Sequence, residues 1–298
     1  NFKILRGVRY SRFKPPLHLN MLTRLAHRLL IRRFKAPRLA HHTSPQALGL
    51  QAQSVQIDAI DGGHLFGWWI PSASSSNTLH ATPTAVVLHG WGANASLMLP
   101  MAPWLNQIGF NALFIDARCH GNSSDAEFTS MPRFAEDLEA AQAWVFNQHG
   151  IAPQHMVALG HSVGAGAVLL SASRSSWAGV VSLSAFAHPA DMMWRFMREH
   201  HIPGKRIGHW VLSHVQSVIG FRFDDIAPEN TIQRVQCPVM LVHGANDTEV
   251  PLSEAERIQQ NAGTSTRLMV VPHVGHDLRP AMQELAPEVT AFLKSVVQ

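Results

Sequence analysis

Residues 159–165 read LGHSVGA, a stretch that decides the interpretation of the chain because it joins two apolar runs through a Gly-x-Ser-x-Gly pentapeptide. The run before it, at 156–159, is typical of a short buried strand, and the small apolar residues at 165–170 favour a helix packed closely on a sheet. A serine at such a sharp turn presents its hydroxyl at the rim of the sheet, beside the first N–H groups of the helix. A glycine-rich turn with an ordinary exposed serine has the same pattern, so the pentapeptide needs support from the rest of the chain.

Short apolar runs alternate with amphipathic segments on both sides of this stretch. A β-hairpin is expected over residues 55–70, because two alternating runs flank a tight Asp-Gly-Gly turn. Further strands are expected at 85–88, 112–115, 179–183, 239–242 and 268–271, and helices at 97–107, 134–148, 253–260 and 282–297. Continuous apolar strands between helices predict a parallel sheet covered on both faces.

Polar or glycine-rich stretches follow four of the predicted strands. They read HGWGAN at 89–94, DARCHGNS at 116–123, HGANDTEVP at 243–251 and PHVGHD at 272–277. Because functional groups collect at the carboxyl ends of parallel strands, we expect these stretches to lie near Ser162. A nucleophile, an acid and a base then follow one another along the chain as Ser162, Asp247 and His276.

In register with the strand pattern, these motifs resemble the α/β-hydrolase superfamily, and most of all its prolyl-oligopeptidase-like or serine-aminopeptidase-like group. The resemblance covers residues 50–298 and implies an α/β-hydrolase fold: a mostly parallel central sheet flanked by helices, with a short helical cap insertion. It implies that Ser162 is the nucleophile, that His276 is the general base and that Asp247 orients the imidazole. The backbone N–H groups of Trp91 and Val163 would form the oxyanion hole.

Competing residues remain for two of these roles. Asp225 and Glu249 are alternative acids, and His273 is an alternative base. Asp247 is favoured by its setting in the HGANDTEVP stretch, and His276 by the glycine that precedes it.

Four other residues at the strand ends are expected to support the site without reacting. We expect His89 to brace the loop that carries the oxyanion donors, and Asp116 and Arg118 to pin neighbouring loops. Cys119 is expected to be a small buried residue near the pocket.

Residues from about 186 to 231 interrupt the alternation and form the candidate cap. They are rich in Met, Trp, Phe and Val. Because these apolar side chains recur at helical spacing, we expect most of them to pack in the core. Those that face the site would select an apolar acyl substrate. His161, Trp194 and Trp210 are the predicted substrate-binding residues.

The N-terminal part of the chain is predicted to be a basic arm, residues 1–48, ahead of a hydrolase domain at 49–298. Leu22, Leu25 and Leu29 recur at helical spacing between basic residues. One interpretation is peripheral contact with an anionic membrane surface, and the other is a helix packed on the catalytic domain. Nucleic-acid binding is not expected, because the arm lacks a base-reading module and the remainder is not basic.

Composition excludes several other classes of protein. The two cysteines cannot build a disulfide framework, and no Cys/His cluster has the spacing of a zinc site. Phosphate-loop and dinucleotide fingerprints are also missing, so we expect no metal and no cofactor. Without a membrane-length apolar run or a signal-peptide pattern, we expect a cytoplasmic protein that could associate with membranes through its arm.

The predicted function is hydrolysis of a carboxylic ester, or of a thioester or lactone, through an acyl-enzyme intermediate. A serine peptidase of the aminopeptidase type is the first alternative. It would need carboxylates near the pocket to hold a free α-amine, and the cap offers Asp191, Glu199, Asp224 and Asp225. The second alternative is a non-catalytic, membrane-associated binding module, which would have no use for all three residues of the triad.

Overall fold

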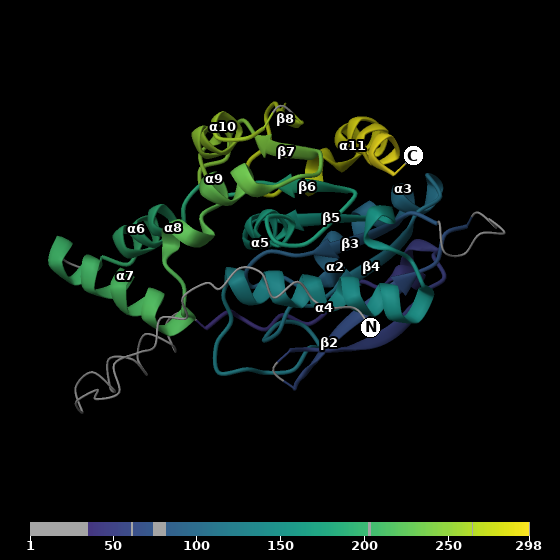
Figure 1. Cartoon of the computed structure of the whole chain (residues 1–298), viewed down its shortest axis with the longest axis horizontal. Helices are drawn as coiled ribbons and strands as arrows, with labels where there is room; N and C mark the ends of the chain where they lie inside the picture. Colours follow the sequence, from purple (N-terminus) through teal and green to yellow (C-terminus); the bar gives the residue numbers. More distant parts are fainter. Residues whose placement is uncertain (1–34, 61, 74–81, 202–203, 264, 298) are drawn as a thin grey trace.

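The computed structural model describes residues 35–60, 62–73, 82–201, 204–263 and 265–297. An eight-stranded sheet in the order β1-β2-β4-β3-β5-β6-β7-β8 forms its centre (Figure 1). Its strands are β1 (Gln53–Asp58), β2 (His64–Ile70), β3 (Thr84–Leu88), β4 (Asn111–Ile115), β5 (Met156–His161), β6 (Gly179–Leu183), β7 (Val239–Gly244) and β8 (Thr266–Val271). The β1–β2 and β2–β4 pairs are antiparallel, and the other pairs are parallel. The predicted hairpin and mostly parallel sheet are therefore confirmed.

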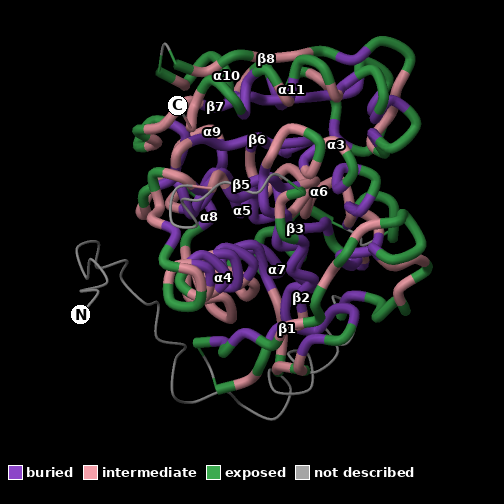
Figure 2. The backbone as a smooth tube through the Cα atoms, turned by 90° about the vertical axis from the view of Figure 1, so that its right-hand side faces the viewer, coloured by how far each residue is buried: buried purple, intermediate pink, exposed green. Residues whose placement is uncertain are grey.

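Helices cover both faces of this sheet, as predicted. One face packs against α4 (Met131–His149), α5 (Val163–Ala172) and α10 (Leu252–Gln260). The other face packs against α3 (Ala102–Gln107) and α11 (Met282–Val296). The central strands lie wholly inside, and exposure is concentrated on the outer helices and loops (Figure 2).

The predicted helix at 97–107 is present but not continuous. The segment instead consists of α2 (Ala95–Met98), a 3₁₀ turn (Leu99–Met101) and α3. Pro100 and Pro103 lack the N–H group that a continuous helix would need at these positions, and each lies in the first turn of a new segment.

The predicted cap is present between β6 and β7. It consists of α6 (Pro189–Glu199), α7 (Lys205–Ile219), α8 (Phe223–Ile226) and α9 (Pro228–Thr231). Figure 1 shows α6 and α7 extending away from the sheet. Gly208 allows these two helices to approach closely, because a Cβ atom on it would lie 2.2 Å from the ring of Trp194.

The described part of the N-terminal region begins at Lys35 and includes a 3₁₀ turn at Pro45–Leu48. Residues 36–42 lie against the loops at the carboxyl edge of the sheet, where Ala36 is buried. The apolar spacing that begins at Leu22 lies outside the described residues, so the domain boundary at 48 and membrane contact through the arm stay predictions. Within the described ranges, the helices are too short or too polar to cross a bilayer.

Candidate active site

Ser162 occupies the turn between β5 and α5 that the pentapeptide predicts. Its backbone has φ 55° and ψ −115°, a strained conformation for a residue with a side chain. The flanking glycines are required because a side chain at either position would collide with neighbouring backbone atoms. A Cβ atom on Gly160 would lie 2.2 Å from the carbonyl oxygen of Gly164, and one on Gly164 would lie 2.4 Å from that of His89.

The structure brings Ser162, His276 and Asp247 together from three different loops. The Nε2 atom of His276 lies 3.0 Å from the Oγ atom of Ser162, and its Nδ1 atom lies 2.8 Å from Oδ2 of Asp247. Both distances are within hydrogen-bonding range. The ring of His276 therefore connects a hydroxyl to a carboxylate, which is the arrangement needed to activate a serine.

The carboxylate of Asp247 is held from both sides after β7. Oδ1 accepts the N–H groups of Glu249 at 3.0 Å and Val250 at 2.8 Å, and Nε2 of His243 lies 3.4 Å from Oδ2. Burial acts to raise the pKa of Asp247, but the hydrogen bonds from His243, His276 and Val250 outweigh it and hold the pKa below its usual range. Asp247 is therefore ionised at neutral pH.

The loop that carries His276 is fixed through its own backbone. The carbonyl oxygen of His276 lies 2.9 Å from Nε2 of His161 and accepts the hydroxyl of Ser184 at 3.2 Å. Burial lowers the pKa of His161 to about 4, so its ring is neutral at pH 7 and donates Nε2–H to that carbonyl. A neutral ring 5.0 Å from the ring of His276 does not repel the positive charge that His276 gains when it accepts a proton.

The loops of the acid and the base also contact each other directly. A Cβ atom on Gly244 would lie 2.4 Å from the carbonyl oxygen of Val274 and 2.3 Å from that of Gly275. The N–H group of Asn246 donates to the same Val274 oxygen at 2.9 Å. Glycine at 244 therefore lets the end of β7 lie against the loop that follows β8.

We call residues 89–96, which follow β3, the oxyanion loop. Its Gly90 lies against Ser162, since a Cβ atom there would be 3.1 Å from the Cβ atom of Ser162. Among the described residues, the N–H of the next residue, Trp91, has no hydrogen-bond acceptor. The N–H of Val163 belongs to the first turn of α5, where a helix has no acceptor of its own. Both predicted oxyanion donors are thus available beside Ser162.

Histidine side chains hold this loop, as predicted for His89. Its Nδ1 atom lies 2.6 Å from the carbonyl oxygen of Gly90, and its Nε2 atom accepts the N–H of Ala117 at 3.0 Å. Burial lowers the pKa of His89 to about 3, so the ring stays neutral and keeps both bonds. His120 contributes a third bond, because its Nε2 atom accepts the N–H of Gly92 at 3.0 Å.

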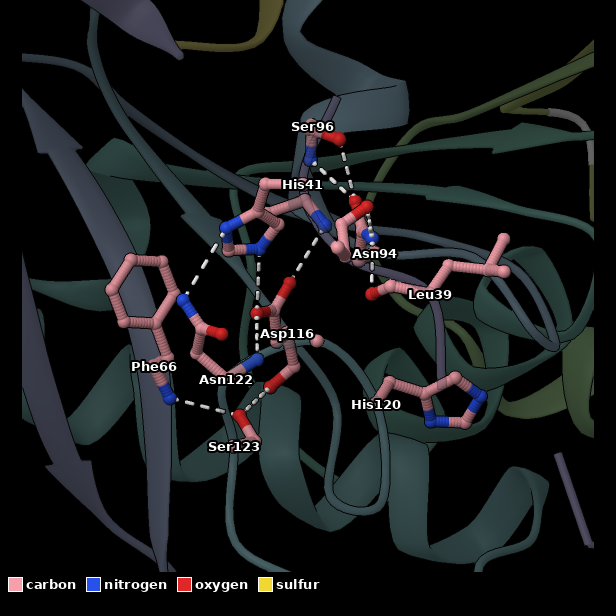
Figure 3. A network of polar contacts seen from close by, with 12 residues as sticks. Leu39, His41, Phe66, Asn94, Ser96, Asp116, His120, Asn122 and Ser123 are labelled. Atoms are coloured by element: carbon pink, nitrogen blue, oxygen red, sulfur yellow. Dashed lines mark hydrogen bonds and ion pairs between the residues drawn. The ribbon is translucent and has the colours of Figure 1, made fainter. Parts of the chain in front are cut away.

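Asp116 and Arg118 pin loops, as expected. Asp116 is fully buried and accepts the N–H groups of Ala95 at 2.7 Å and Asn122 at 2.8 Å (Figure 3). The Nε and Nη2 atoms of Arg118 both donate to Oδ1 of Asp137 in α4, at 2.8 Å and 2.6 Å. Cys119 is buried and lies in the cavity wall, with a left-handed φ of 66°.

A cavity of about 820 Å³ opens in front of the triad, and Ser162, His161 and His276 lie in its wall. Most of the remaining wall is apolar and comes from the cap and from the loop before α4. It includes Phe128, Met131, Met192, Met193, Phe196, Val215, Val218 and Ile219. This size lies near the upper end of the roughly 300–1,000 Å³ of ligand pockets.

Two of the three predicted substrate-binding residues do not reach this cavity. His161 lines it, but Trp194 packs between α6 and α7, against Gly208 and 5.3 Å from the ring of His209. Trp210 is 44% exposed and stacks on His214. Its helix directs Val215 and Val218 into the cavity instead.

The alternative acid and base residues lie apart from the triad's hydrogen bonds. His273 is exposed, and the backbone of Asp225 makes hydrogen bonds with the carbonyl of Arg222 and with the side chain of Arg234. Glu249 lines the cavity, but it contacts Asp247 only through its backbone N–H. Within the described residues, no group of three or more His, Cys, Asp or Glu side chains could hold a metal ion.

Comparison with known proteins agrees with this geometry. A family model described as serine aminopeptidase, S33, matches residues 80–222. The chain is 29% identical over 230 residues to the uncharacterized protein YfhR of Escherichia coli K12, a match that covers 76% of this chain and 73% of YfhR.

Two solved esterase structures share the fold. The Pyrococcus furiosus esterase Pf2001 has a TM-score of 0.70 and 22% identity, over 88% of this chain and 97% of that chain. Est1E from Butyrivibrio proteoclasticus, solved with bound ferulic acid, has a TM-score of 0.65 and 18% identity, over 82% of this chain and 99% of that chain. With its mostly parallel eight-stranded sheet, its serine turn and its helical cap, the chain has the α/β-hydrolase fold, and over residues 80–222 it is similar to the serine aminopeptidase family.

Proposed function

We propose that this hydrolase is a serine esterase that cleaves a carboxylic ester, or a related thioester or lactone, through an acyl-enzyme intermediate. The observation that carries the proposal is the pair of hydrogen bonds from Ser162 through His276 to Asp247, at 3.0 Å and 2.8 Å. This connection supplies a nucleophile, a base and an orienting acid in one line.

In the acylation step, the Oγ atom of Ser162 attacks the carbonyl carbon while Nε2 of His276 accepts its proton. The ionised Asp247 holds Nδ1–H and stabilises the imidazolium that forms. The N–H groups of Trp91 and Val163 bind the negative oxygen of the tetrahedral intermediate. The intermediate collapses when the C–O bond to the leaving alcohol breaks and His276 returns the proton to that oxygen.

In the deacylation step, water replaces the alcohol. His276 accepts a proton from the water as it attacks the acyl carbon, and the same two N–H groups bind the second oxyanion. Ser162 leaves with the proton from His276, and the carboxylic acid is released. The residues proposed for acylation are thus sufficient for deacylation.

An apolar acyl group is the substrate portion that the cavity favours. Its wall is built largely from Met, Phe and Val side chains, which bind apolar groups of varied shape. The likeness to Pf2001 and Est1E, both named as esterases, supports an ester over an amide.

The peptidase alternative has less support from the cap. None of its four carboxylates (Asp191, Glu199, Asp224 and Asp225) lines the cavity. Asp191 instead pairs with Arg257 at 2.8 Å, and Asp224 lies 3.1 Å from His188. The cap therefore offers no carboxylate to an α-amine in the cavity, and the carboxylates in its wall, Glu127, Glu249 and Asp277, come from other loops.

The proposal is tested with nitrophenyl esters and a fluorophosphonate probe, which labels an activated serine. The wild-type protein should hydrolyse the esters and take up the probe, and Ser162→Ala should lose both while keeping its circular-dichroism spectrum. Ser54→Ala, at an exposed position in β1, is the matched control and should behave as wild type. Ester hydrolysis by Ser162→Ala would refute the nucleophile assignment, and cleavage of aminoacyl amides alone would favour the peptidase.

A further inference from the structure

Residues 36–42, which we call the N-terminal strap, lie across the loops that follow β3 and β4 (Figure 3). The first connection is made by Asn94 of the oxyanion loop. Its Nδ2 atom donates to the carbonyl oxygens of Leu39 at 2.9 Å and Ala40 at 3.1 Å. Asn94 is only 1% exposed, so in the folded protein its Nδ2 atom depends on these two carbonyls for its hydrogen bonds.

His42 makes the second connection, at the end of the oxyanion loop. The hydroxyl of Ser96 donates to Oδ1 of Asn94 at 2.6 Å, and its oxygen lies 2.7 Å from Nδ1 of His42. Because a hydroxyl has one hydrogen, Nδ1 of His42 must donate to this oxygen. The backbone N–H of His42 also donates to it, at 3.3 Å.

His41 makes the third connection, through Asp116. Its Nε2 atom lies 2.9 Å from Oδ2 of Asp116, whose other oxygen accepts the N–H of Ala95 in the oxyanion loop. The ring of His41 is held in place by Trp68, at 4.5 Å between ring centroids, and by Phe66, at 5.2 Å. The strap thus reaches the oxyanion loop both directly and through a buried carboxylate.

Pro37 and Arg38 make the remaining contacts between the strap and the two loops. A Cβ atom on Gly92 would lie 2.9 Å from Pro37, so the strap packs directly on the residue that follows Trp91. Arg38 donates to the carbonyl oxygens of Gly121 at 2.6 Å and Ser123 at 2.8 Å. These carbonyls belong to the loop whose His120 accepts the N–H of Gly92, so Arg38 holds the loop that supports Gly92.

We propose that the N-terminal strap is a positioning element of the oxyanion hole, which sets the place of the Trp91 N–H through Asn94, Ser96 and Asp116. The inference rests on the proposed function, because it assigns a task in the same reaction. A donor must meet the oxyanion within a few tenths of an ångström, and a misplacement of about 1 Å costs about 100-fold in rate. Residues that precede the hydrolase core in the chain would thereby determine its rate.

The test compares two substitutions of His41 in the full-length protein. His41→Phe keeps an aromatic ring against Trp68 but removes the bond to Asp116, and His41→Gln retains an N–H that can reach the carboxylate. We expect His41→Phe to lower kcat about 10- to 100-fold with KM changed less than about threefold, and His41→Gln to recover most of the loss. Gln46→Ala changes an exposed side chain of the same N-terminal region that donates to the carbonyl of Ala52 and not to the oxyanion loop, so it should match wild type.

A pair of inhibitors separates positioning from general damage. The Oγ atom of Ser162 adds to the carbonyl of a trifluoromethyl ketone and gives a tetrahedral oxyanion, whereas the matching methyl ketone binds mainly as the unreacted carbonyl. Under the proposal, His41→Phe weakens the trifluoromethyl ketone by the same factor as kcat/KM and leaves the methyl ketone unchanged.

Each other result overturns the inference. Equal weakening of both ketones would make the strap part of the cavity wall, and wild-type kcat per fluorophosphonate-titrated site would make its role purely structural. Wild-type protein that hydrolyses no ester would instead refute the proposed function, which keeps the two failures distinguishable.

Discussion

The carboxylate of Asp247 is held rigidly through one oxygen while its other oxygen bonds to the ring of His276. Its Oδ1 atom is occupied by two backbone N–H groups of its own loop, which leaves Oδ2 for the ring of His276. The carboxylate therefore cannot rotate without breaking bonds on its far side. Its fixed position determines which nitrogen of His276 carries the proton in the resting protein.

Asp247→Asn tests this assignment. Asn can keep the two backbone bonds through its oxygen, but its amide N–H would then face Nδ1 of His276 and favour the tautomer protonated on Nε2. That tautomer cannot accept the proton of Ser162, so kcat should fall about 10⁴-fold while the fold is retained. Steady-state kinetics with a nitrophenyl ester measure the change, with Asp225→Asn, the alternative acid, as the control. Equal losses in both variants would contradict the role of Asp247.

Motifs were sufficient to predict which residues meet at the triad, because their order and the strand ends that carry them are both visible in the sequence. They did not predict the bonds of His161 and Ser184 to the carbonyl of His276. Those bonds join residues about a hundred positions apart through a backbone carbonyl. Every residue has a backbone carbonyl, so the sequence does not indicate which one accepts a hydrogen bond. The same reason hid the role of Leu39 and Ala40.

At the scale of elements, α7 divides its residues between three environments. Val211 and Leu212 are buried, Val215 and Val218 line the cavity, and Ile207 is 48% exposed. Helical periodicity predicted an apolar cap helix, but it did not predict which apolar residues face the substrate. The orientation of α7 over the cavity is set by its close contact with α6 at Gly208, which cannot be inferred from the sequence of α7 alone.

A larger residue at position 218 should shorten the substrates that the protein accepts. Val218→Trp fills part of the cavity, and each methylene excluded from apolar contact costs about 0.8 kcal/mol, roughly fourfold in kcat/KM. We expect a large loss for dodecanoate esters and little change for acetate esters. Ile207→Trp adds the same ring on the exposed side of α7 and should alter neither. Equal losses for both esters in Val218→Trp would show that the cavity does not hold the acyl chain.

At the scale of the whole molecule, the alternation of strands and helices was enough to predict the fold, because a parallel sheet with both faces covered requires apolar strands. The break at Pro100 was not predicted, although proline lacks the N–H group that a continuous helix needs. The attachment of residues 36–42 was not predicted, because this segment lacks periodicity and is held by side-chain and backbone atoms of the loops that follow β3 and β4.

Acid should destabilise the folded protein through its buried neutral histidines. The pKa of His89 is lowered to about 3 when folded, so between about pH 6.5 and pH 3 the unfolded chain binds a proton that the folded one does not. The contribution of His89 to the free energy of unfolding is fully present above pH 6.5 and decreases as the pH falls through this window. Between pH 7.5 and 4.5 the loss is about 3 kcal/mol.

Urea unfolding of wild type and His89→Gln at these two pH values isolates that contribution. The variant is less stable at pH 7.5 but should lose about 3 kcal/mol less than wild type on acidification. His209→Gln removes an exposed histidine of the cap and should keep the wild-type pH dependence. Parallel curves for all three proteins would contradict a neutral His89.

The contact of Gly244 with Val274 and Gly275 has a consequence for how this protein could change over evolution. Asp247 and His276 lie on two loops that touch each other, whereas the cap enters the chain earlier, between β6 and β7. An insertion in either touching loop would displace both reactive groups together. Changes within the cap would leave their mutual geometry intact, so new substrate preferences can arise there while the machinery of bond cleavage stays the same.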